Sequence, residues 1–153
     1  DYLSFSLFCT LFGSSPTSRL FLNVREKLSL CYYCSPVPDG LKGTMIVACG
    51  IDCANKEKAT EAILRELEEV KNGRFTDEEL ANAVRAMQNS YREAMDSPAS
   101  LSSWFTVRSL AGITETPEEY AVKLNACTRE DIVRAANRLT LDTIYFLKGK
   151  DVQ

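Results

Sequence analysis

The spacing of apolar residues at the start of the chain predicts two successive helices. Leu3, Leu7 and Leu11 recur every fourth residue and phenylalanines fill neighbouring positions, which predicts a helix buried on nearly all sides. Gly13 is expected to end this helix in the left-handed conformation. A second apolar stripe predicts a helix from Pro16 to Ser29.

Strand-like patterns occupy three short segments. Cys31–Cys34 and Thr44–Ile51 predict an antiparallel hairpin, with Pro36, Pro38 and Asp39-Gly40 in a long turn between them. The apolar run of the second strand suggests burial on both of its faces. Thr143–Leu147 (TIYFL) predicts a third strand near the end of the chain.

The segment between these strands reads as consecutive helices from Asn55 onward. Their starts are marked by capping residues, namely Thr76 with Glu79, Ser97-Pro98, Thr116-Pro117 with Glu119, and Thr128 with Asp131. The pattern therefore predicts an α+β fold, with a three-stranded antiparallel sheet and helices packed mainly on one face. We expect residues 1–153 to form a single domain.

The beginning of the chain and the small sheet suggest that this domain was excised from the C-terminal part of a larger protein. Asp1 leads directly into the apolar helix, and three strands are few for 153 residues. Missing strands would leave an open sheet edge and uncover apolar surface around Phe5 and Phe8. Self-association through that edge is the expected result.

Composition narrows the classes of function. Eighteen Lys and Arg against 21 Asp and Glu give a net charge of −3, so there is no basic surplus for binding nucleic acid. No apolar run reaches the ~18–20 residues that cross a membrane, and the apolar start lacks the basic flank of a signal peptide. We therefore expect no nucleic-acid or membrane partner. Most of the six cysteines lie among apolar residues, which favours free thiols and a reducing, cytoplasmic location.

Histidine is absent from the sequence. This excludes serine and cysteine triads that use an imidazole base, as well as the paired-histidine zinc motifs of metallopeptidases. The isolated chain is therefore expected to be inactive.

Six cysteines raise the question of metal or redox chemistry. The spacings Cys31-x2-Cys34 and Cys49-x3-Cys53 are compatible with a four-thiolate zinc site or a redox pair. In a strand, however, an offset of three points two side chains to opposite faces. We therefore expect buried, reduced thiols and no metal ligands in this chain.

The acidic run around Glu66 is expected to be a solvated helix face.

Arg25 and Tyr32 form the candidate site. Arg25 borders the apolar stripe of its helix and Tyr32 lies in the strand that follows directly, so their polar ends should converge within about 10 Å on the same side of the fold. Such a pair could contact a peptide carbonyl or a developing oxyanion. An ordinary surface arginine and a half-buried tyrosine are the alternative.

Residues 12–33, FGSSPTSRLFLNVREKLSLCYY, resemble a signature of the pitrilysin/insulinase family of zinc metallopeptidases. A small-residue loop is followed by S-R-L-F, then V-R-E-K, then L-x-Y. The signature is that of the second, non-zinc-binding domain. The sequence of this segment is most similar to bacterial members encoded as paired proteins. The family often has glycine where Ser29 stands, so Ser29 would have a strained backbone if that position is left-handed.

The resemblance implies a role in peptide hydrolysis by a larger assembly. In the family, this domain faces a zinc-bearing domain or partner subunit and supplies an arginine and a tyrosine to the substrate side; by motif these are Arg25 and Tyr32, with Tyr33 as a second substrate-binding phenol. Zinc would be held outside this chain. Two functions follow as expectations: a substrate-facing, non-catalytic peptidase domain, or a zinc-free assembly module that pairs with the zinc-bearing subunit.

Overall fold

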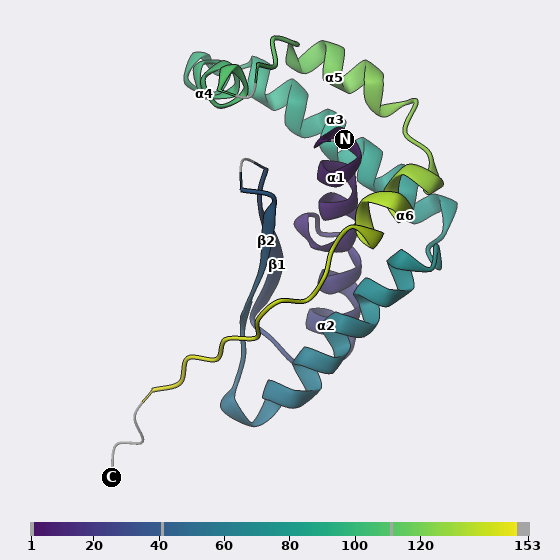
Figure 1. Cartoon of the computed structure of the whole chain (residues 1–153), viewed down its shortest axis with the longest axis vertical. Helices are drawn as coiled ribbons and strands as arrows, with labels where there is room; N and C mark the ends of the chain where they lie inside the picture. The colour runs from purple at the N-terminus through teal and green to yellow at the C-terminus, as the bar shows by residue number, and fades with distance from the viewer. Residues whose placement is uncertain (1, 41, 111, 150–153) are drawn as a thin grey trace.

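The computed structural model describes residues 2–40, 42–110 and 112–149 and shows an α+β fold in which helices cover one face of an antiparallel hairpin (Figure 1). The helical segments are α1 (Tyr2–Cys9), η1 (Thr10–Ser14), η2 (Leu20–Lys27), η3 (Cys53–Asn55), α2 (Lys56–Lys71), α3 (Asp77–Met95), α4 (Pro98–Ser109), α5 (Pro117–Leu124) and α6 (Arg129–Asn137). The strands are β1 (Tyr33–Asp39) and β2 (Thr44–Gly50).

The first helix lies at the centre of the molecule, as its unbroken apolar pattern predicts. Segments α1 and η1 run between the hairpin and an outer layer that includes α3 and α6 (Figure 1). Leu7, Phe8 and Phe12 are completely buried. The expectation of exposed apolar surface at Phe8 is therefore wrong, because helices and β1 enclose it; Phe5 is half-buried against the same core.

The second predicted helix begins later than its sequence pattern suggests. The observed helix is η2, and it is π-helical. It starts late because residues 15–18 first make a turn, in which the Ser18 hydroxyl donates to the Ser15 carbonyl at 2.6 Å. Gly13 does not have the predicted left-handed conformation. It is needed instead for close approach, since a Cβ there would clash with Pro36 and lie 2.9 Å from Leu20 Cδ1.

The predicted hairpin is confirmed, but its first strand is longer than expected. Tyr33 lies opposite Gly50 and Asp39 opposite Thr44, so both prolines fall inside β1 and not in the turn. Proline is tolerated at the open edge of a sheet, and in the described ranges β1 pairs only with β2. One face of the hairpin packs on the helices. Ile46 is 67% exposed on the other, so β2 is not buried on both faces.

The predicted third strand is wrong. The described residues after α6, including Thr143–Leu147, have no regular secondary structure, and Tyr145 is 81% exposed. A strand needs a neighbouring ladder for its backbone hydrogen bonds, and this segment runs past the hairpin without pairing (Figure 1).

The later helices begin where the sequence predicts, and each start is capped by hydrogen bonds with a nearby side chain. Thr76, Thr116 and Thr128 each form a capping box with the acidic residue three positions later, and Ser97 caps α4. No helix in the described part of the chain combines the length and hydropathy needed to cross a bilayer.

Candidate functional site

A sharp chain reversal brings the end of η2 beside the start of the hairpin. Ser29 has a φ of 50°, the left-handed conformation that the resemblance raised for this position. The Leu30 amide donates to the Val24 carbonyl at 3.2 Å, and the Tyr32 amide donates to the Gly50 carbonyl at 2.7 Å. These bonds fix the loop at both ends, so side chains from η2 and from the loop face one another.

Arg25 and Tyr32 line one open pocket of about 400 Å³. Ser29, Asp52 and Asn55 contribute to its wall. Both residues therefore contribute to one pocket, while the expected separation of about 10 Å between their polar ends stays a prediction.

The Arg25 guanidinium has no strong fixed partner within the described residues. It lies 4.7 Å from the centre of the Phe21 ring, and its Nε is 3.6 Å from Glu26 Oε1. Both side chains of this ion pair are largely exposed, so the pair holds the guanidinium only loosely. Arg25 is thus available to a ligand at the pocket wall.

Tyr32 is 68% exposed, and its hydroxyl donates to Asp52 Oδ1 at 2.9 Å. This hydrogen bond to a carboxylate raises the pKa of Tyr32 above its usual value. The phenol therefore stays protonated at neutral pH and remains a hydrogen-bond donor. Asp52, which sequence reasoning did not single out, positions the phenol; its place just after β2 gives no local signal of this contact.

Tyr33 is not among the residues that line this pocket. Its ring lies over Gly50, where a Cβ would clash with it. The two adjacent tyrosines therefore occupy different environments.

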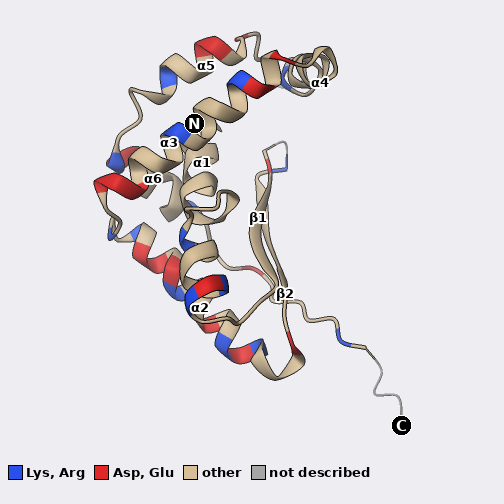
Figure 2. Ribbon diagram, turned by 180° about the vertical axis from the view of Figure 1, so that it is seen from behind, with Lys and Arg blue, Asp and Glu red and all other residues tan. Residues whose placement is uncertain are grey.

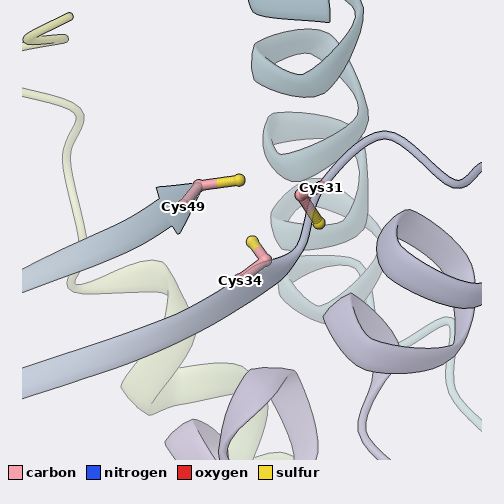
Figure 3. Close-up of side chains that lie close together, drawn as sticks. All are labelled: Cys31, Cys34 and Cys49. Carbon is pink, nitrogen blue, oxygen red and sulfur yellow. The ribbon is translucent and has the colours of Figure 1, made fainter. Parts of the chain in front are cut away.

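The structure overturns the expectation that Cys31 and Cys34 point to opposite faces. Cys31 precedes β1, so strand alternation does not apply to it. Its sulfur lies with those of Cys34 and Cys49 in a group whose members are all within 4.8 Å of one another (Figure 3). Cys53 lies outside this group, exposed on η3.

One member of this thiol group ionises more easily than the others. Hydrogen bonding from Cys34 lowers the pKa of Cys49 to about 7, while the bond to Cys49 and burial raise the pKa of Cys34. A thiolate at Cys49 is thus stabilised by its neighbours.

The acidic face of α2 also differs from its prediction. Glu66 is buried, and its Oε2 accepts hydrogen bonds from Arg19 Nε at 3.0 Å and Asn23 Nδ2 at 2.9 Å. Arg19 also donates to Glu79 Oε1 at 2.8 Å. This network joins η2 to α2 and α3 and so holds in place the helix that carries Arg25.

Comparison with known proteins identifies the class to which this chain belongs. The chain belongs to the pitrilysin/insulinase family of peptidases, and residues 1–87 match the family model described as the peptidase M16 inactive domain. The resemblance stated from residues 12–33 is thereby confirmed.

Particular relatives share most of this chain but only part of their own length. It is 34% identical over 151 residues to the probable inactive metalloprotease YmfF of Bacillus subtilis, covering 99% of this chain and 35% of that protein. A conserved protein from Enterococcus faecalis V583 matches at 33% identity and a TM-score of 0.81, covering 90% of this chain and 32% of its own. This chain thus spans about a third of the length of these two relatives.

A more distant structural neighbour shows the fold alone. A protease from Helicobacter pylori has a TM-score of 0.78 at 19% identity, covering 89% of this chain and 34% of its own.

Proposed function

We propose that this chain is the substrate-facing, non-catalytic domain of a zinc-dependent peptidase assembly. The carrying observation is that Arg25 and Tyr32 line one open pocket beside the hairpin. Zinc would be held by another domain or by a partner subunit, since the sequence has no histidine for the family's zinc motif.

In this role the two side chains act on the peptide backbone. The Tyr32 phenol, held protonated beside Asp52, would donate to the carbonyl of the bound peptide. The positive charge of the Arg25 guanidinium would attract the same carbonyl oxygen as negative charge develops on that oxygen. Tyr33, the first residue of β1, would contact the peptide beyond the pocket.

The test is hydrolysis by an assembly of this domain with its zinc-bearing partner. Tyr32→Phe should lower the rate by roughly 10²–10³, which is the effect of losing one oxyanion donor. Folding should be unchanged because the exposed ring remains. Tyr145→Phe, in the exposed C-terminal segment, is the matched control and should retain full activity. Full activity of the Tyr32 variant would contradict the proposal.

A second candidate function is a zinc-free assembly module, which the inactive relative favours. The outer face of the hairpin supports it, because the ribbon of β2 carries no charged residue and Val37 and Ile46 are exposed there (Figure 2). Under this alternative, Ile46→Lys would weaken binding to the zinc-bearing subunit while Tyr32→Phe would leave peptide turnover intact.

We also propose that the chain can self-associate and that it resides in a reducing cytoplasm. The free side of the hairpin could pair with a second copy, which light scattering of the concentrated chain would reveal as a species of twice the mass.

All six cysteines are free thiols, as a reducing cytoplasm would maintain them.

A further inference from the structure

We propose that Cys31, Cys34 and Cys49 form a three-thiolate site for a single soft metal ion. This site is distinct from the zinc centre of the peptidase family, which uses histidine and glutamate. It requires neither peptide binding nor a partner subunit, so it stands independently of the function proposed above.

The fold assembles the three ligands from segments that sequence spacing keeps apart. Cys34 and Cys49 lie directly opposite one another in the antiparallel register. Cys31 comes from the loop before β1, and the three side chains converge at the end of the hairpin (Figure 3). Two ligands therefore sit on a paired ladder and the third on a loop that is fixed at Ser29 and Tyr32.

The sulfur separations suit a shared metal ion. Thiolates bind zinc at ~2.3 Å, so three of them around one ion lie roughly 4 Å apart. The three sulfurs are already within 4.8 Å of one another, so each pair needs to close by less than about 1 Å to reach that separation. Side-chain rotation of this size leaves the hairpin unchanged.

The surroundings favour a soft cation and give it access. Thiolates select ions such as Zn²⁺ and Cu⁺ over the hard ions that prefer oxygen. Cys34 is buried, whereas Cys31 lines the open pocket, so an ion could enter from that side.

Charge also bears on the identity of the ion. Arg25 and Cys31 line the same open pocket, so a positive charge lies on the accessible side of the three thiols. Three thiolates around a divalent ion retain one negative charge, which Arg25 could balance; around a monovalent ion they retain two. Three thiolates can hold Cu⁺ by themselves, whereas Zn²⁺ would take a fourth ligand from water.

The reduced chain can be tested with the metals themselves. It would be incubated anaerobically with zinc chloride or with a Cu⁺–acetonitrile complex, passed over a desalting column, and measured for metal content. One ion per chain is expected. Bound metal should also protect Cys31 and Cys49 from iodoacetamide, as read by peptide mass mapping, while Cys53 stays reactive.

Single variants separate this site from incidental thiol binding. Cys31→Ser and Cys49→Ser should weaken metal binding by roughly 100-fold or more in a chelator competition. Cys53→Ser is the matched control and should bind as the unaltered chain does. Cys34 is buried, so a Cys34→Ser variant is informative only if its circular dichroism and melting temperature are unchanged. If they change, the test depends on Cys31→Ser, at a half-buried position, and on the alkylation pattern.

Opposite results would overturn the site. These are a chain that retains neither metal, metal lost on Cys53→Ser but kept on Cys31→Ser, or equal alkylation of Cys31 and Cys49 with and without metal. Formation of a Cys34–Cys49 disulfide in air, with no metal uptake by the reduced chain, would likewise replace the metal site by a redox pair.

Discussion

Replacing Glu66 by alanine should destabilise the fold far more than its position in an acidic helical run suggests. The carboxylate is 6% exposed and accepts hydrogen bonds from Arg19 and Asn23. Its removal leaves Arg19, itself 11% exposed, without one of its two carboxylate partners.

The magnitude follows from what remains around Arg19. Breaking a buried ion pair by removing one partner costs about 3–5 kcal/mol, because the other charge is left unpaired. Here the guanidinium keeps Glu79 at 2.8 Å and the Arg74 carbonyl at 3.1 Å. A loss of about 2–3 kcal/mol in the free energy of unfolding is therefore expected for Glu66→Ala.

Urea denaturation followed by circular dichroism measures this loss, with Glu68→Ala as the control on the same helix. Glu68 is 58% exposed and its ion pair, with Lys71, is on the surface, so its variant should change stability by less than about 0.5 kcal/mol. Combining Glu66→Leu with Arg19→Met should recover part of the loss, since both charges are then removed together. Equal effects of Glu66→Ala and Glu68→Ala would refute the reasoning.

Three other outcomes are expected. Ser29→Gly should raise the melting temperature, because it relieves a left-handed residue that costs about 1 kcal/mol; a lower melting temperature would contradict this. Gly13→Ala should lower stability by about 1–3 kcal/mol through its clash with Pro36, measured by the same urea series. Iodoacetamide should modify Cys49 increasingly as pH rises through about 7, the pKa at which its thiolate forms, while Cys9, whose pKa burial raises to about 12, stays unreactive; equal rates at neutral pH would refute the assignment.

Sequence reasoning succeeded where the physical cause is local. A capping box needs only a threonine and an acidic residue three positions later, so Thr76 and Thr128 could be assigned without knowledge of the fold. Arg25 and Tyr32 could be placed together for a related reason, because the short connection between them leaves little room to diverge.

It failed where a distant segment decides the environment. Glu66 looked solvated because its neighbours in sequence are charged, yet Arg19 approaches it from the start of η2. Cys31 was assigned to a strand by its β-like residues, and the error reversed the direction of its thiol. The Thr143–Leu147 pattern has the composition of a strand, but composition cannot supply the neighbouring ladder.

The two prolines of β1 limit how large an assembly the hairpin could build. Pro36 and Pro38 are two residues apart, so they share one side of the strand, and proline is accommodated where its nitrogen does not enter the ladder. That side of β1 therefore lacks the donors of these two positions for an added strand, whereas the free side of β2 has no proline. A filament grows only when every copy offers two open edges, and the two prolines weaken one of the two edges of this hairpin. Pairing through sheet edges would thus close on itself as a two-fold dimer and stop there.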